Sequence, residues 1–278
     1  MKIAFQKMHG LGNDMMVVDC RELACAPTFD TTQIRAWSNR KTGIGFDQLM
    51  TIESPSDSVN DARYRIFNAD GGAVEQCGNG VRCVAAAIAA KRGVSSAALT
   101  LESPAGLIHA DVQSNGAVSV NMGIPDFTPA AVPIHADARN NMYSLEILGE
   151  IIDVAAVSVG NPHAVVIVDD VTSAPLQSVG QAIGASDYFP EGVNVGFAEI
   201  VDRDHVRLRV LERGVGETRA CGTGACAAMA CLRELGHLDA SATITLPGGS
   251  LVIDWAQLGE PITMTGPATF AFEGCITL

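Results

Sequence analysis

Two cysteines stand in nearly the same short context, far apart in the chain. Cys77 lies in "EQCGNGVRCVAA" and Cys221 lies in "RACGTGACAAMA", each directly before a glycine-containing turn and an alanine-rich apolar run. A thiol at the start of a helix meets unpaired backbone N–H groups, which favour the thiolate and lower the thiol pKa. The same N–H groups can bind a carboxylate. The pattern therefore indicates acid–base chemistry beside an anion site.

Two acid–base groups that face one carbon from opposite sides can invert its configuration. One group takes a proton as the thiolate, and the other delivers a proton to the far face as the thiol. The α-proton of an amino acid is weakly acidic, so the developing carbanion needs electrostatic support. Two helix N-termini aimed at the α-carboxylate of the substrate would provide that support. Cys77 and Cys221 are therefore the candidate catalytic pair.

Other interpretations of the cysteines stay open on the residues alone. A cysteine without a disulfide is commonly a small buried apolar residue, and we prefer this interpretation for Cys83, Cys226 and Cys231, inside the expected helices. A phosphate-binding loop is disfavoured because no Lys-Ser/Thr pair follows the glycines. The cysteine spacings match no common zinc pattern, and we expect no metal site.

The chain repeats itself with an offset near 145 residues. The two cysteine blocks align, and "LTLESPAGLIHADV" (99–112) resembles "ITLPGGSLVIDW" (244–255). "GNDMMVVD" (12–19) resembles "GNPHAVVIVD" (160–169), and "GFDQLMTI" (45–52) matches "GVNVGFAE" (192–199) weakly. Four matches in one order predict two copies of one structural plan.

Each copy must position its thiol at the start of a buried helix. The segments 78–91 and 222–235 are apolar nearly all round and are followed by Gly93 and Gly236, so we expect two buried helices. Most other segments, such as "KIAFQKM", "QLMTIE" and "GAVSVNM", have the β-branched and aromatic content of strands. We predict an α/β (α+β) fold in which each half is a curved, mostly antiparallel sheet wrapped around a central helix.

We expect two pseudo-symmetric domains. The first spans residues 1–122 and contains Cys77, and the closing strand 267–278 returns to it. The second spans residues 123–266 and contains Cys221, with the proline-rich segment 123–137 as the crossover between the halves. The active site is expected in the cleft between them.

Composition narrows the classes of partner. The 278 residues are 47% hydrophobic and carry a formal net charge of −13, which argues against a nucleic-acid or anionic membrane surface. The N-terminal residues hold no apolar stretch long enough for a signal peptide, so we expect a cytoplasmic protein with reduced thiols. None of the four lysines lies in a context that suggests a pyridoxal-phosphate site, and we expect no cofactor.

At these motifs the sequence resembles the diaminopimelate epimerase family. "KMHGLGND", "GIGFDQ", "GNPH", "ERG.GET.ACGTGACAA" and the cysteine block at 75–83 stand in the family's order along the whole chain. The resemblance implies cofactor-independent interconversion of LL- and meso-2,6-diaminopimelate, in lysine and peptidoglycan precursor biosynthesis. It also implies a homodimer, although Phe272 stands where many members carry a tyrosine near the dimer contact.

The resemblance also implies roles for particular residues. Its catalytic cysteines fall on Cys77 and Cys221, and His163 and Glu212 match groups that adjust the thiol pKa. Its substrate-binding residues fall on Asn13, Gln48, Asn68, Gly78, Asn79, Asn161, Asn194, Glu212, Arg213, Gly222 and Thr223. The residue types agree with these roles, because Arg213 can bind a second carboxylate in bidentate fashion and Glu212 can accept from an ammonium.

Two alternatives remain. A proline, hydroxyproline or histidine racemase of the same two-cysteine type would share the thiols without needing Arg213 as a second carboxylate clamp. A two-lobed amino-acid-binding protein would bind the ligand without exchanging its α-hydrogen.

Overall fold

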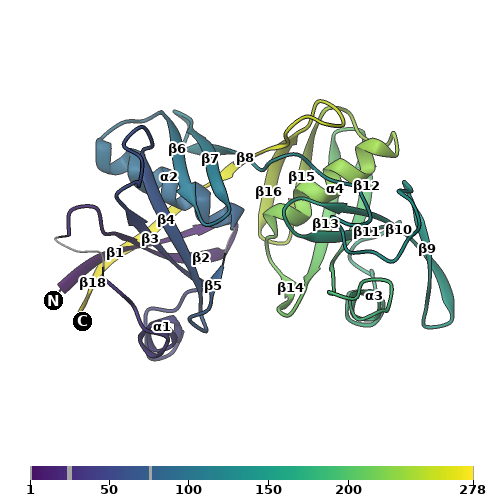
Figure 1. Cartoon of the computed structure of the whole chain (residues 1–278), viewed down its shortest axis with the longest axis horizontal. Coiled ribbons are helices and arrows are strands. Elements are labelled where there is room, and N and C mark those ends of the chain that lie inside the picture. Colours follow the sequence, from purple (N-terminus) through teal and green to yellow (C-terminus); the bar gives the residue numbers. More distant parts are fainter. Residues whose placement is uncertain (1, 24–26, 75–76, 278) are drawn as a thin grey trace. The chain divides into compact units, whose positions relative to one another are not determined.

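The chain folds into two compact units. The computed structural model describes residues 2–23, 27–74 and 77–277 (Figure 1). The first unit comprises Met1–Asn121 together with Thr265–Leu278, and the second comprises Met122–Met264. The two ends of the chain therefore belong to the same unit.

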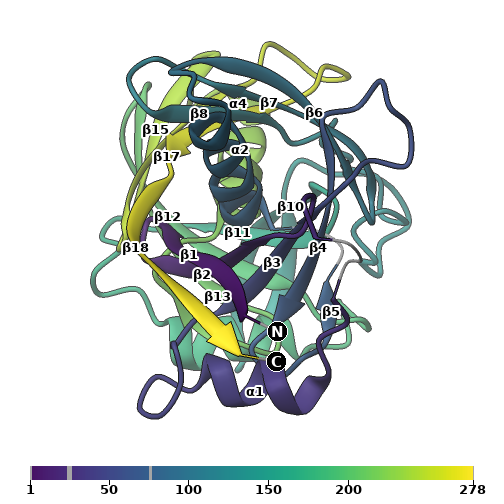
Figure 2. The same cartoon turned by 90° about the vertical axis from the view of Figure 1, so that its left-hand side faces the viewer.

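Strands surround one long helix in the first unit. Its elements are β1 (Lys2–Gly10), β2 (Asn13–Asp19), α1 (Thr31–Ser38), β3 (Gln48–Glu53), β4 (Ala62–Asn68), β5 (Ala73–Val74), α2 (Gly78–Arg92), β6 (Ala97–Ser103), β7 (Gly106–Val112), β8 (Ala117–Asn121) and β18 (Thr269–Thr277). β1 pairs antiparallel with β18 and β2, β2 pairs parallel with β3, β3 antiparallel with β4, and β4 parallel with β6. α2 packs against β1, β2, β3, β7 and β8, inside the curve of these strands (Figure 2).

The second unit is built in the same way around a second helix. Its elements are β9 (Tyr143–Ile147), β10 (Glu150–Ser158), β11 (Pro162–Ile167), η1 (Leu176–Gly180), α3 (Gln181–Gly184), β12 (Asn194–Asp202), β13 (His205–Glu212), β14 (Gly216–Thr218), α4 (Gly222–Glu234), β15 (Ser241–Leu246) and β16 (Gly249–Asp254), and β17 (Thr263–Pro267) runs across the boundary. α4 packs against β10, β11, β12, β13, β15 and β16.

The pairing order confirms the predicted repeat. In the second unit β10 pairs antiparallel with β11, β11 parallel with β12, β12 antiparallel with β13, and β13 parallel with β15. The same sequence of orientations runs through β1, β2, β3, β4 and β6. The expected mixed α/β fold, with a mostly antiparallel curved sheet around a central helix in each half, is confirmed.

One of the aligned sequence pairs is out of register by one residue. Met15 lies opposite Gln48 in the first unit, and His163 lies opposite Asn194 in the second. Because Met15 and His163 occupy equivalent places after the Gly-Asn turns, Gln48 corresponds to Asn194. The weak match of 45–52 with 192–199 instead aligned Asp47 with Asn194, and strand pairing corrects it.

The two central helices begin and end as their sequences predict. Cys77 and Cys221 are the N-cap residues of α2 and α4, with backbone φ of −153° and −123°. α2 ends at Gly93, whose φ of 68° lies in the left-handed region that glycine adopts easily. Cys83, Cys226 and Cys231 are at most 1% exposed, so they are core residues as expected.

The second glycine of each cysteine motif lies close to a strand of its own unit. A Cβ at Gly80 would lie 2.8 Å from Met50 Cε, and a Cβ at Gly224 would lie 2.9 Å from Val210 Cγ2. Met50 belongs to β3 and Val210 to β13, so these glycines let the first turn of each helix lie directly on a strand of its own unit.

Three short helices, α1, η1 and α3, were not predicted from the sequence. α1 begins after Asp30, whose side chain accepts from the Gln33 backbone N–H while the Gln33 side chain accepts from the Asp30 N–H. This capping box was readable in the sequence "DTTQ" and was missed. η1 and α3 are five and four residues long, too short for hydrophobic periodicity to reveal. Among the described residues, no helix has both the length and the apolar character needed to cross a bilayer.

Replacing Gly224 with alanine should destabilise the second unit. The new methyl group would press on Val210 and, at 3.2 Å, on the Cys221 sulfur. Overpacking of this kind costs about 1–3 kcal/mol, against a helix-propensity gain of at most about 1 kcal/mol. We expect a lower urea midpoint for Gly224→Ala and partial recovery in Gly224→Ala/Val210→Ala. Equal midpoints for wild type and Gly224→Ala would contradict this packing role.

Candidate active site

In the first unit the Cys77 sulfur lies at the open end of α2. Its Sγ accepts a hydrogen bond from the Gly80 backbone N–H at 3.3 Å. On another side, Sγ lies 3.8 Å from the Asn13 side-chain oxygen, to which a thiol can donate. Cys77 is half-buried. A donor for the thiolate and an acceptor for the thiol are therefore both in place.

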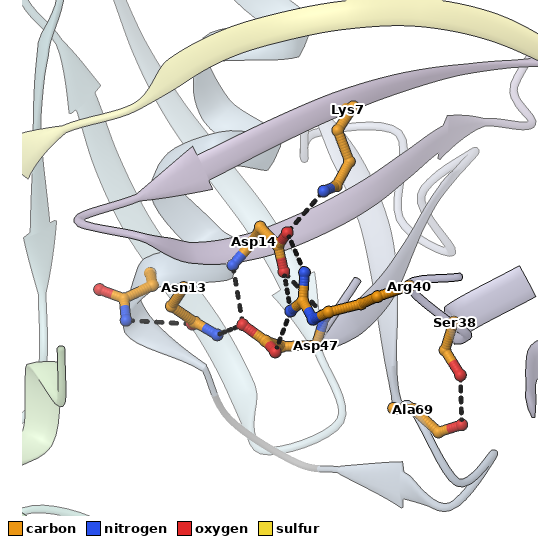
Figure 3. A network of polar contacts seen from close by, with 8 residues as sticks. Lys7, Asn13, Asp14, Ser38, Arg40, Asp47 and Ala69 are labelled. Carbon is orange, nitrogen blue, oxygen red and sulfur yellow. Dashed lines mark hydrogen bonds and ion pairs between the residues drawn. The ribbon is translucent and has the colours of Figure 1, made fainter. Parts of the chain in front are cut away.

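Asn13 is held in a chain of polar side chains (Figure 3). Its Nδ2 donates to Asp47 Oδ2 at 3.0 Å, and its Oδ1 accepts from Asn79 Nδ2 at 3.1 Å. Asp47 Oδ1 accepts from Arg40 Nη2 at 2.7 Å. Asn13 is thus fixed at both ends of its amide beside the Cys77 sulfur.

Gln48 and Asn68 lie next to each other on β3 and β4. Gln48 Nε2 donates to Asn68 Oδ1 at 3.1 Å, and the two residues are opposite each other in the strand pair. Gln48 Oε1 is a buried acceptor without a hydrogen-bond partner in the described part of the chain. A buried acceptor of this kind suits a ligand N–H group such as an ammonium.

In the second unit the Cys221 sulfur has the same backbone contact in a drier place. Its Sγ accepts from the Gly224 N–H at 3.3 Å and lies 3.5 Å from Thr223 Oγ1. Cys221 is only 4% exposed. Burial raises the pKa of the Cys221 thiol, the negative charge of Glu212 raises it further, and the hydrogen bonds from Thr223 and Gly224 offset only part of this. The N–H contact at the helix terminus lowers the pKa of the Cys221 thiol as expected, but burial outweighs it, so the net shift is upward.

Glu212 and His163 both reach the surroundings of Cys221. The Thr218 hydroxyl donates to the Glu212 carboxylate. The negative charge of this carboxylate acts on the Cys221 thiol. His163 Nε2 lies 3.0 Å from Thr223 Oγ1 and 3.1 Å from Asn161 Oδ1. His163 thus connects to Cys221 through the Thr223 hydroxyl.

The His163 imidazole is neutral near pH 7. Burial, with a smaller contribution from the positive charge of Arg213, lowers the pKa of His163 from 6.5 to about 3. The ring is 1% exposed, so an added charge would lie in a medium that solvates it poorly.

Asn194 and Arg213 are tied to the backbone around them. Asn194 Nδ2 donates to the Pro162 carbonyl at 2.9 Å, and its Oδ1 accepts from the Arg213 N–H at 2.9 Å. Arg213 is exposed, and its Nη1 donates to the Glu191 carbonyl at 2.6 Å. Asn194 therefore braces β11 and the start of the turn after β13, while the Arg213 guanidinium lies at the surface.

The predicted site residues fall into one cluster in each unit. The first cluster contains Asn13, Gln48, Asn68, Cys77, Gly78 and Asn79; the second contains Asn161, His163, Asn194, Glu212, Arg213, Cys221, Gly222 and Thr223. Gly78, Asn79, Gly222 and Thr223 form the first turns of α2 and α4. Within the described ranges, no group of three or more His, Cys, Asp or Glu side chains is placed to hold a metal ion.

Sequence reasoning missed the groups that support Asn13. Asp47 accepts from Asn13 and is itself bound by Arg40, and Arg82 donates to Asn79 at the other end of this network of side chains. Asp47 stands in "GFDQ" and Arg82 in "CGNGVRC", inside motifs that had already been singled out. Nothing in their spacing indicated that they hold the two ends of the Asn13–Asn79 pair.

Comparison with known proteins decides the family. A family profile described as diaminopimelate epimerase matches residues 5–128 and 155–271. The chain belongs to the diaminopimelate epimerase family. Proteins named diaminopimelate epimerase from Pseudomonas entomophila (strain L48) and Nitrosomonas europaea are 49% and 50% identical to it over 278 residues, covering 100% of both chains in each case. The resemblance inferred from the motifs is confirmed.

Two solved structures, of an epimerase and of a probable racemase, share the fold of this diaminopimelate epimerase family member. A hydroxyproline epimerase from Agrobacterium vitis, with bound trans-4-OH-L-proline, is similar with a TM-score of 0.69 at 18% identity, over 99% of this chain and 92% of that one. A probable proline racemase from Agrobacterium radiobacter K84 is similar with a TM-score of 0.71 at 17% identity, over 99% and 93%. At such low identity these similarities establish the fold alone.

The neutral His163 should make the protein sensitive to acid. Between pH 6.5 and pH 3 the unfolded chain binds a proton at His163 and the folded chain does not, so stability falls as the pH falls through this range. At pH 5 the loss from this group is about 2 kcal/mol. We expect wild type to lose more stability than His163→Gln when urea midpoints are compared at pH 7 and pH 5. Parallel losses in the two proteins would show that His163 titrates normally in the folded state.

Proposed function

We propose that this chain interconverts LL- and meso-2,6-diaminopimelate by two-base proton transfer, as an epimerase of lysine biosynthesis. The observation that carries the proposal is the shared geometry of the two thiols. Cys77 and Cys221 each cap a long buried helix and each accept a backbone N–H at 3.3 Å. The family membership and the full-length relatives named diaminopimelate epimerase support the same reaction.

The reaction requires one substrate molecule to meet both thiols, one on each face of its α-carbon. One cysteine, as the thiolate, forms an S–H bond with the α-hydrogen, and the C–H electron pair stays on the carbon. The other cysteine, as the thiol, then delivers its proton to the opposite face and becomes the thiolate. No net proton is consumed, and the enzyme is left ready for the reverse reaction. Burial favours the thiol form of Cys221 in the protein without substrate, so the thiolate that begins a turnover forms as the substrate binds.

Backbone N–H groups provide the anion site that this chemistry needs. Gly78 and Asn79 begin α2, and Gly222 and Thr223 begin α4, and the N-terminal turn of a helix favours a carboxylate. A carboxylate held there can take up the charge that develops on the α-carbon. The buried Gln48 Oε1 offers an acceptor for an ammonium, and the exposed Arg213 is suited to the second carboxylate.

The proposed mechanism uses only side chains and backbone groups of this chain. A thiol pair performs both proton transfers, so no pyridoxal phosphate or metal takes part. A pair of catalytic thiols works in a reducing compartment, which supports the expected cytoplasmic location.

Hydrogen exchange at the α-carbon tests the proposal. In D2O, LL-diaminopimelate should take up one deuterium at one α-carbon as it becomes the meso isomer, which mass spectrometry and NMR can follow. Proline and histidine, assayed in parallel, should show no comparable exchange. Exchange on proline or histidine instead would favour another racemase, and retention of the α-hydrogen on every substrate would favour a binding protein.

Each cysteine of the pair should be essential. Cys77→Ser and Cys221→Ser should each lose at least about 100-fold in kcat/KM, because a hydroxyl is a far weaker acid than a thiol. The exposed Cys275 supplies a matched control, and Cys275→Ser should keep normal turnover. Near-normal turnover in either of the first two variants would exclude that residue from the proton transfer.

We also propose that the chain acts as a homodimer through β18. Phe270 and Phe272 are 51% and 47% exposed, although large aromatic side chains are usually buried in a monomer. Both stand on β18, where a β-bulge opposite Lys7 and Met8 separates them and directs them to different sides of the strand. The Phe272 ring packs edge-on against Phe5 at 6.1 Å, which holds it in place.

A charged residue at position 272 should break this dimer. Light scattering during gel filtration should give the mass of two chains for wild type and of one chain for Phe272→Glu, because burial of the carboxylate would oppose association. Leu107→Glu, at a second exposed apolar position, is the control and should leave the mass unchanged. A wild-type mass of one chain would contradict the proposal.

A further inference from the structure

The two amides beside Cys77 have a direction that their neighbours determine. A side-chain amide has a donor end and an acceptor end of nearly the same shape, so its orientation depends on its partners. Asn13 meets the Asp47 carboxylate, which only accepts; the N–H end of Asn13 must therefore face Asp47. Asn79 meets the Arg82 guanidinium, which only donates, at 2.8 Å from Nη2 to Oδ1. The oxygen end of Asn79 must therefore face Arg82.

These two end conditions agree with each other. Asn79 points its oxygen toward Arg82 and therefore its Nδ2 toward Asn13. Asn13 points its Nδ2 toward Asp47 and therefore its Oδ1 toward Asn79, so Nδ2 of Asn79 donates to Oδ1 of Asn13. Hydrogen bonds thus run in one sense from the cationic end at Arg82 to the anionic end at Asp47. Reversing either amide would set two donors or two acceptors against each other.

Both end groups are themselves held firmly. Arg82 is fully buried, and its Nε donates to the Pro267 carbonyl at 3.2 Å. Asp47 accepts from Arg40 and from the Asp14 backbone N–H at 3.0 Å, as Figure 3 shows. Burial by itself would raise the pKa of Asp14, but hydrogen bonds from Arg40 and Lys7 hold the pKa of this carboxyl well below its usual range, so it anchors Arg40 as an anion.

The oriented Asn13 oxygen faces the Cys77 sulfur at 3.8 Å. An amide oxygen can accept from the S–H of a thiol but offers nothing to a thiolate, which needs a donor such as the Gly80 N–H. The orientation of Asn13 therefore favours the protonated form of Cys77. Among the described residues, Tyr64 and Cys83 interact electrostatically with Cys77, and burial raises the pKa of both, to about 12 for Cys83. Both are therefore neutral at pH 7.

We propose that Asp47 and Arg82 are positioning residues that hold the Asn13 oxygen toward Cys77 and so bias this cysteine toward the thiol. The bias is a property of the first unit alone. The positions of Asp47 and Arg82 are taken by Val193 and Cys226 in the second copy, which has neither end group. The consequence for turnover rests on the proposed function, in which Cys77 exchanges a proton with the substrate.

Alkylation of Cys77 measures this bias without substrate. The tryptic peptide 66–82 contains Cys77 as its only cysteine, and the next peptide, 83–91, contains the buried Cys83. Mass spectrometry after timed iodoacetamide treatment of the full chain therefore gives the rate at Cys77, while the unlabelled Cys83 peptide reports that the unit is folded. Both peptides come from the same sample.

In Asp47→Asn, the amide at 47 no longer requires the N–H end of Asn13 to face it, so only the Arg82–Asn79 end still holds the Asn13 oxygen toward the sulfur. We expect alkylation of Cys77 at pH 7 to accelerate about threefold to tenfold, which corresponds to the worth of one hydrogen bond. Asp47→Glu keeps a carboxylate and should return the rate toward that of wild type. Asp14→Asn removes a charge from the same cluster without touching the Asn13 side chain, and should change the rate less.

A double-mutant cycle separates orientation from loss of charge. If Asp47 acts through Asn13, Asp47→Asn should have no further effect on the alkylation rate in an Asn13→Ala background. The same acceleration in that background, or an unchanged rate in Asp47→Asn with Cys83 still protected, would overturn the proposal. If Cys83 becomes alkylated in Asp47→Asn, the unit has opened, and the Asp47→Glu and Arg82→Lys variants are measured instead. Arg82→Lys keeps a donor to Asn79. Alkylation rates of Cys77 equal to wild type in both variants support the proposal, and accelerated rates in both oppose it. None of these outcomes depends on epimerase activity, so failure of the proposed function would be recognised separately.

Discussion

The hydrogen bond from a backbone N–H to a cysteine sulfur at the start of a buried helix is the contact around which each unit is arranged. It needs a cysteine at the N-cap, a glycine three residues later that lets the first turn lie on a strand, and a helix apolar enough to be enclosed. The strands around α2 and α4 enclose these helices on several sides. In each unit, a helix enclosed by a curved sheet thus places one thiol at the N-terminal end of that helix.

The two copies share a backbone plan but differ in the polar groups around their thiols. Cys77 is half-buried, with an amide oxygen on one side and a backbone N–H on another. Cys221 is nearly inaccessible, and burial and Glu212 both favour its protonated form. His163 stands where the first unit has Met15, so an imidazole in one copy corresponds to a thioether in the other. The two copies therefore have the same fold, but the two sulfurs have different environments.

Polar residues in the site regions divide into those that keep a hydrogen-bonding atom without a partner among the described residues and those whose polar atoms all bind the backbone. Gln48 keeps a buried acceptor oxygen, whereas both polar ends of Asn194 are occupied by backbone groups. Gln48 and Asn194 nevertheless hold the same position in the two copies. A residue type at a repeated position is therefore not enough to assign a role, because the partners of its amide differ.

The sequence by itself determined the repeat, the two central helices, most strands and the family, because those features depend on local propensity, hydrophobic pattern and motifs of adjacent residues. It also showed the capping box of α1, which was overlooked. Only the tertiary structure decided the register that equates Gln48 with Asn194, the raised pKa of Cys221 and the convergence of Asp47 and Arg82 on the Asn13–Asn79 pair. Strand register, burial and the direction of an amide are set by neighbours that lie far away along the chain, so no local pattern of residues encodes them.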